Sequence, residues 1–78
     1  MKVDIRAPEV GDGVTHATVA GWHKKVGEAV EEGELLVDVS TDKAAFDVMA
    51  PASGTLTERL VEADTEVEVG QVIGRIEP

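Results

Sequence analysis

The stretch LLVDVSTDKAAFDVM, residues 35–49, decides the fold because it reads as two short strands joined by a tight turn. Apolar and polar side chains alternate on both sides of the turn sequence TDKA, residues 41–44, which is the pattern of strands with one buried face. If those four residues form the turn, facing residues have numbers that sum to 85. Two facing pairs then lie on the inner face: Val39 with Phe46, and Val37 with Val48.

The same register gives the hairpin an outer face, formed by Leu36, Asp38, Ser40, Ala45, Asp47 and Met49, and places Lys43 in solvent at the tip. Asp38 stands directly opposite Asp47, and like charges that face each other across a ladder cost a few tenths of a kcal/mol, up to about 1. Together with Asp42 they form an acidic collar around Lys43. Two interpretations stay open: a recognition surface for a partner, or solvated carboxylates of the kind that strand faces often carry.

Short β-branched runs that end at Gly, Pro and acidic residues continue along the whole chain, whereas helical periodicity is poor. Strands this short and this regularly spaced indicate an all-β sandwich or barrel. At 78 residues the chain makes one small domain, residues 1–78. We expect strands within residues 2–7, 17–23, 35–40, 44–51, 54–61 and 71–78, and turns or loops within 8–14, 24–34 and 62–70.

The two halves of the chain resemble each other at an offset of 37 residues. Residues 17–39 superpose on residues 54–76, which matches the turn glycines and several apolar positions. This favours a duplicated supersecondary unit, with a chance match of two β-rich halves as the alternative. Two such units in one core are naturally related by a pseudo-two-fold axis. Because the counterparts of position 43 fall at 6 and just beyond 78, we expect the Asp-Lys turn at one pole and both termini at the other.

Seven Lys and Arg against sixteen Asp and Glu give a net charge of −9. Such a surface repels phosphate backbones and anionic headgroups, so neither nucleic acid nor a membrane is expected as a partner. The lack of cysteine excludes disulfides and fits a reducing compartment, for which we favour the cytoplasm over the mitochondrial matrix. His16 and His23 have no third ligand at a suitable spacing, and no catalytic constellation is visible, so neither a metal site nor an active site is expected.

The sequence STDKAAFDVMAP, residues 40–51, resembles the lipoyl-attachment hairpin of 2-oxo acid dehydrogenase complexes, usually written E-[ST]-D-K-A-x-x-[ED]-V-x-[AS]-P. Residues 7–39 are similar to the opening of that family, so the resemblance covers essentially the whole chain. It implies a flattened barrel-sandwich of two four-stranded antiparallel sheets. It also implies that lipoic acid, in amide linkage on Lys43, makes this chain a carrier of acyl groups and reducing equivalents, with Asp42 and Ala44 as neighbours in the attachment turn.

The same resemblance implies a non-catalytic domain that is part of a dihydrolipoyl acyltransferase chain. Its partners are then a lipoyl ligase or transferase, a thiamine-diphosphate-dependent 2-oxo acid decarboxylase, the acyltransferase core and a flavoprotein dihydrolipoyl dehydrogenase. Tethering replaces diffusion by a high effective concentration at each active site. The candidates for partner recognition lie on the hairpin and on the 9–13 loop, which the family fold places beside it: Glu9, Gly11, Asp12, Asp38, Ser40, Thr41 and Asp47.

Two departures from the family pattern bear on recognition. Ser40 stands where the family usually has Glu, and His16-Ala17 stands where it usually has Gly or Glu-Gly. Biotin carrier domains share the fold but usually have Met on both sides of the lysine, so Asp42 and Ala44 argue against biotin. A biotin carrier and an unmodified β-sandwich binding module are the alternatives to a lipoyl carrier.

Overall fold

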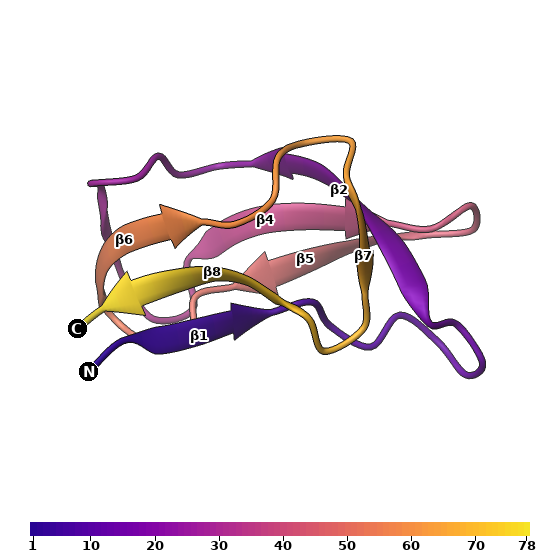
Figure 1. Ribbon diagram of the computed structural model, residues 1–78, viewed down its shortest axis with the longest axis horizontal. Helices are drawn as coiled ribbons and strands as arrows, with labels where there is room; N and C mark the ends of the chain where they lie inside the picture. Colours follow the sequence, from indigo (N-terminus) through magenta and orange to yellow (C-terminus); the bar gives the residue numbers. More distant parts are fainter.

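Figure 1 shows the computed structural model, which describes all residues 1–78 as eight strands. The strands form two antiparallel four-stranded sheets: sheet A, in the order β1-β8-β6-β3, and sheet B, in the order β5-β4-β2-β7. The predicted all-β fold is confirmed, and no helix that could span a membrane is present. The strands are β1 (Val3–Arg6), β2 (His16–Trp22), β3 (Ala29–Val30), β4 (Leu35–Ser40), β5 (Ala45–Met49), β6 (Gly54–Arg59), β7 (Glu66–Glu68) and β8 (Val72–Glu77).

The core lies between the inner faces of the two sheets and is entirely apolar. No polar or charged side chain is buried in it, and no buried side-chain nitrogen or oxygen lacks a hydrogen bond. Removing this apolar surface from water is the main force that offsets the conformational entropy lost on folding. The buried side chains are those of Ile5, Ala7, Val10, Ala17, Val19, Val30, Leu36, Val37, Val39, Val48, Ala50, Leu56, Val67, Ile73 and Ile76.

Strands β4 and β5 pair in the predicted register. Val37 faces Val48, Asp38 faces Asp47, and Val39 faces Phe46. The three valines are buried and Phe46 is half-buried, whereas Asp47 is exposed, so the assignment of inner and outer faces is confirmed over this part of the hairpin.

The prediction that Leu36 points outward is wrong, because Leu36 is fully buried. The ladder shifts between Leu35 and Val37, and Met49 faces Leu35. A β-bulge of this kind opposes two residues of one strand to one residue of the other. It therefore lets two successive side chains, Leu36 and Val37, enter the core.

The internal repeat is confirmed by the backbone. The ladder between β2 and β4 shifts between Val19 and Gly21, and the ladder between β6 and β8 shifts 37 residues later, between Leu56 and Glu58. Gly33 and Gly70 share a φ of 86°. Strand order follows the same relation, since β4, β2 and β7 of sheet B correspond to β8, β6 and β3 of sheet A.

Each half of the repeat contributes one short strand to the sheet of the other half. β3 pairs with β6, and β7 pairs with β2. Residues 24–34 and 62–70 were expected to hold only turns, and the structure adds these strands of two and three residues there. Because the partners are distant in the sequence, neither strand has a local hairpin signal.

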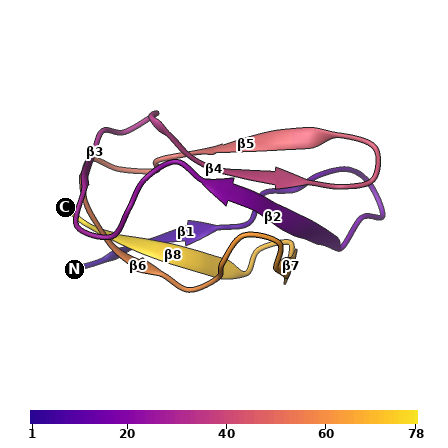
Figure 2. The ribbon, with the colours of Figure 1, turned by 90° about the horizontal axis from the view of Figure 1, so that it is seen from above.

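The hairpin and the chain ends lie at opposite ends of the molecule. The molecule measures 33 × 19 × 18 Å. Figures 1 and 2 both place the β4–β5 tip at one end of the long axis and the two termini at the other. The arrangement expected from the 37-residue offset is therefore confirmed. A tether at either terminus would leave the tip free.

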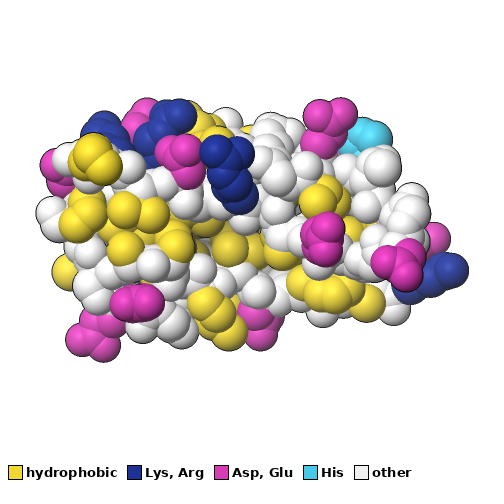
Figure 3. Space-filling model, turned by 90° about the horizontal axis from the view of Figure 1, so that it is seen from below, with side chains coloured by type: hydrophobic (Ala, Val, Ile, Leu, Met, Phe, Trp, Pro, Cys, Tyr) yellow, Lys and Arg dark blue, Asp and Glu magenta, His cyan; other side chains and the backbone are white.

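Basic side chains are distributed unequally. No strand of sheet B contains Lys or Arg, whereas Arg6, Arg59 and Arg75 belong to sheet A. A hydrogen bond from Lys2 Nζ at 3.2 Å, together with the positive charges of Lys2 and Arg75, lowers the pKa of Glu58 below its ordinary value. Figure 3 shows that the Lys and Arg side chains of one face gather mainly toward the end with the termini.

Candidate functional site

Lys43 lies at the tip of the β4–β5 hairpin, in solvent. Its side chain is exposed, and its Nζ atom makes no hydrogen bond or ion pair with the rest of the chain. Lys24, by contrast, lies 2.9 Å from Glu34, and this hydrogen bond raises the pKa of Lys24. The ammonium group of Lys43 is therefore displayed without a competing partner.

The turn is closed by one backbone hydrogen bond and by the side chain of Thr41. The N–H of Thr41 donates to the carbonyl of Ala44 at 2.8 Å. Neither Asp42 nor Lys43 has a positive φ, so the turn is not of type I′, which needs positive φ at both central residues. The N–H groups of Lys43 and Ala44 both donate to Thr41 Oγ1, at 3.3 and 3.2 Å.

The acidic residues of the hairpin lie at different distances from the lysine. Asp42 is in the turn, is exposed and has no ion pair. Asp38 and Asp47 face each other three residues away from the ends of the turn, which corresponds to about 10 Å of strand. His23 Nε2 lies 2.8 Å from an oxygen of Asp38, so this carboxylate has a partner of its own. The predicted collar is thus one acid beside Lys43 and a separate pair farther along the strands.

The 9–13 loop lies at the hairpin end of the molecule, as Figures 1 and 2 show. Glu9, Gly11 and Asp12 are exposed there. Gly11 and Gly13 have φ values of 138° and 77°, which favour glycine, and Val14 N–H donates to the Gly11 carbonyl at 3.3 Å. The two acids of this loop that are recognition candidates, Glu9 and Asp12, thus carry negative charge at the same pole as Lys43.

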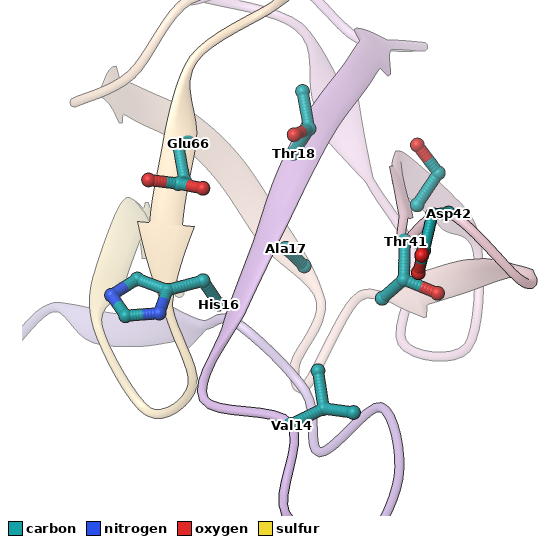
Figure 4. Close-up of a pocket in the computed structure, with 8 residues that line it drawn as sticks. Val14, His16, Ala17, Thr18, Thr41, Asp42 and Glu66 are labelled. Atoms are coloured by element: carbon teal, nitrogen blue, oxygen red, sulfur yellow. The ribbon is translucent and has the colours of Figure 1, made fainter.

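An open hollow of about 470 Å³ lies beside the hairpin tip (Figure 4). Three of its lining residues, Ser40, Thr41 and Asp42, directly precede Lys43 in the sequence. The opposite side is formed by β2 and β7. Thr18 of β2 faces Ser40 of β4 on one side and Glu66 of β7 on the other. The hollow is lined by Val14, His16, Ala17, Thr18, Ser40, Thr41, Asp42 and Glu66.

Sequence reasoning named Ser40, Thr41 and Asp42 as site residues and missed the other five residues that line the hollow: Val14, His16, Ala17, Thr18 and Glu66. The residues of β2 lie near the turn because β2 pairs with β4, and Glu66 lies there because β7 pairs with β2, which joins residues about 50 apart in the chain. The available signal was the repeat itself, because the pairing of β3 with β6 is its counterpart.

The two histidines are separate from each other and each lies near one carboxylate. His16 is the first residue of β2, and its Nε2 lies 3.7 Å from Glu68. His23 directly follows the same strand and pairs with Asp38. No group of three side chains suited to holding a metal ion occurs in the structure.

Comparison with known proteins identifies the family of this fold. The family model described as "Biotin-requiring enzyme" matches residues 3–76. The acetyltransferase component of the pyruvate dehydrogenase complex of Corynebacterium glutamicum is 45% identical over 73 residues, which are 94% of this chain and 11% of that protein. The succinyltransferase component of the 2-oxoglutarate dehydrogenase complex of Escherichia coli K12 is 45% identical over 74 residues, 95% of this chain and 18% of that protein.

The chain thus spans less than a fifth of the length of these curated relatives. A solved structure, the lipoyl domain of the 2-oxoglutarate dehydrogenase complex from Azotobacter vinelandii, superposes with a TM-score of 0.79 at 39% identity. That match covers 97% of this chain and 96% of the solved chain. These matches agree with the sequence motifs and with the two four-stranded sheets. The chain belongs to the biotin and lipoyl domain family, as one of its lipoyl domains.

Proposed function

We propose that this domain is a lipoyl carrier in which lipoic acid is amide-linked to Nζ of Lys43. The observation that carries the proposal is the display of one unpaired lysine at a two-strand tip, at the pole opposite the termini. A modifying enzyme needs an amine that stands clear of its own domain, and this position supplies it. The relatives are dihydrolipoyllysine acyltransferase components, whose names describe such a lysine.

The residues around Lys43 fit an amide-linked group. Ala44 and Ala45 are exposed and small, so they leave space beside the lysine side chain. Amide formation removes one positive charge, which takes the net charge of the chain from −9 to −10. When attached, lipoate supplies a dithiolane that accepts an acyl group together with two electrons and releases them again. The role of the chain is to hold the amine at the tip and to be recognised there.

The proposed partners are the enzymes of a 2-oxo acid dehydrogenase complex. A lipoyl ligase or transferase would modify Lys43, and a decarboxylase, an acyltransferase core and a flavoprotein dehydrogenase would then use the carrier in turn. Relatives from both pyruvate and 2-oxoglutarate dehydrogenase complexes support this class of partner. A tethered domain with its attachment residue at the far pole would reach each active site at high effective concentration.

Recognition is proposed to involve the exposed acidic residues of the hairpin end. Glu9, Asp12 and Asp42 lie at that end without ion pairs, so their charges are available to a basic partner surface. Asp38 and Asp47 lie farther along the hairpin and would contact only a partner that covers the strands. Ser40 lines the hollow beside the turn, so a partner that enters the hollow would meet its hydroxyl.

Intact-mass analysis after incubation with a lipoyl ligase, lipoate and ATP tests the attachment site. We expect the native chain to gain the mass of one lipoic acid less one water. Lys25→Arg is the matched control, because Lys25 is also exposed and has no side-chain partner. This variant should be modified fully, whereas Lys43→Arg should gain nothing. Modification of Lys43→Arg, or none of the native chain, would contradict the proposal.

The family model also covers biotin-dependent proteins, so a second arm of the experiment uses a biotin ligase with biotin and ATP. Asp42 and Ala44 flank the lysine here instead of methionines, and we expect no streptavidin signal. Biotinylation at Lys43 without lipoylation would make the chain a biotin carrier. If neither ligase modifies it, the unmodified binding module is the remaining function.

A further inference from the structure

The hairpin turn uses a side chain where most two-residue turns use the backbone. In a closed two-residue hairpin the residues that flank the loop exchange both of their N–H···O=C bonds. Here Thr41 N–H donates to the Ala44 carbonyl, but Ala44 N–H donates to Thr41 Oγ1 and not to the Thr41 carbonyl. The second half of the closing pair is therefore supplied by a hydroxyl.

The same hydroxyl fixes the backbone of the lysine itself. Lys43 N–H donates to Thr41 Oγ1 at 3.3 Å, and the hydroxyl in turn donates to the Ala44 carbonyl at 3.4 Å. These contacts are long, so each is weak, but together they engage all the bonding capacity that Thr41 Oγ1 has. The hydroxyl has no donor left for a partner protein.

We propose that Thr41 is a positioning residue for the modification of Lys43. Its hydroxyl anchors the backbone N–H groups of Lys43 and Ala44, and so fixes the direction in which the lysine side chain leaves the hairpin. This inference rests on the proposed function and assigns to Thr41 a role different from direct contact with a partner. Neither Asp42 nor Lys43 has a positive φ, so this turn is not one of the primed turns whose twist matches the flanking strands, and a single backbone hydrogen bond closes it.

Removal of the Thr41 hydroxyl should weaken recognition of the domain by the ligase and leave the chemistry of the Lys43 amine unchanged. Without the hydroxyl the turn samples several conformations, and only a fraction of the molecules present the lysine as the ligase requires. Apparent affinity falls by that fraction, whereas the rate in the bound complex stays the same. We therefore expect Thr41→Val to raise the KM of the lipoyl ligase for the domain about 2- to 10-fold, the range given by the loss of one net hydrogen bond, with kcat unchanged.

Steady-state lipoylation of four proteins tests this: the native chain, Thr41→Val, Thr41→Ser and Thr55→Val. Thr41→Ser keeps the hydroxyl and should restore KM to within about 2-fold of the native value, the lower limit of the expected change. Thr55→Val is the matched control, because Thr55 is an exposed strand residue of β6 whose side chain makes no hydrogen bond. It should leave KM and kcat as they are. Amide hydrogen exchange of Lys43 and Ala44 should accelerate in Thr41→Val only.

Two further measurements separate the outcomes. The rate at which a small activated ester acylates Lys43, monitored by mass spectrometry, should be the same in all variants, since the amine remains exposed. A cooperative urea transition of Thr41→Val, with the same m-value as that of Thr55→Val, would show that the fold is intact. An unchanged KM for Thr41→Val, or a loss of kcat that Thr41→Ser does not restore, would overturn the role of Thr41. Failure of the native chain to be lipoylated would instead overturn the proposed function.

Discussion

Asp64 is the only residue other than glycine with a positive φ, which is 67°. Its counterpart in the other half of the repeat, 37 residues earlier, is Gly27 with a φ of 97°. Both residues make the same contact, because Asp64 N–H donates to the Val19 carbonyl and Gly27 N–H to the Leu56 carbonyl, each at 2.7 Å. The repeat thus imposes a left-handed conformation on a residue with a Cβ atom, which costs roughly 1–2 kcal/mol.

Replacement of Asp64 by Gly should stabilise the domain. Glycine adopts this φ without strain, but it also gains entropy in the unfolded chain, which offsets about 0.4–1 kcal/mol of the benefit. We expect the free energy of unfolding to rise by up to about 1 kcal/mol, measured by urea denaturation. Asp64→Val should lower it, because β-branched residues tolerate positive φ least. A native chain more stable than Asp64→Gly would show that the aspartate side chain contributes more than its backbone costs.

Individual site residues were predictable to the extent that their signals were local. Lys43 and its exposure followed from the turn and from alternation on both sides of it. The strained backbone of Asp64 had no such signal, since aspartate occurs in many turn conformations. The positions of His16 and Glu66 beside the turn depend on the pairing of β2 with β4 and with β7, which no local pattern specifies.

At the scale of elements, the period of two predicted the hairpin register as far as Val37 and failed at Leu36. Alternation assumes an unbroken ladder, and the bulge beyond Val37 breaks it by placing an extra residue in β4. The same bulge occurs between β1 and β8, where the ladder shifts next to Ile5. The short strands β3 and β7 were missed for another reason, because their partners belong to the other half of the chain.

The facing acids of the hairpin should differ in their effect on stability. Asp47→Asn removes the repulsion across the ladder and should raise the free energy of unfolding by a few tenths of a kcal/mol. Asp38→Asn removes the same repulsion but also removes the carboxylate 2.8 Å from His23 Nε2, so we expect no gain. Urea denaturation of both variants at pH 7 measures the difference. Equal gains would show that the contact between His23 and Asp38 contributes nothing to stability.

At the scale of the whole molecule, the offset of 37 residues predicted more than the local patterns did. It placed the Asp-Lys turn and the termini at opposite poles, which requires only that the two halves be equivalent. It did not predict that each half completes the sheet of the other. That exchange follows from packing, because a half with its own short strand unpaired would leave an edge and an apolar face in water. The domain should therefore unfold as one cooperative unit.

Gly33 and Gly70 offer a direct test of this equivalence. Each has a φ of 86°, and a Cβ atom added to either would meet no other atom within 4 Å, so a substitution changes conformational energy alone. We expect Gly33→Ala and Gly70→Ala each to lower the free energy of unfolding by about 1 kcal/mol. For a domain of this size that corresponds to a fall in Tm of about 4–8 °C. Gly21→Ala is the control, because Gly21 has equal space and no positive φ, and it should not destabilise. A difference of more than about 1 kcal/mol between the two losses is a large share of the stability of a small domain. It would show that the two halves have the same backbone conformation but contribute differently to stability.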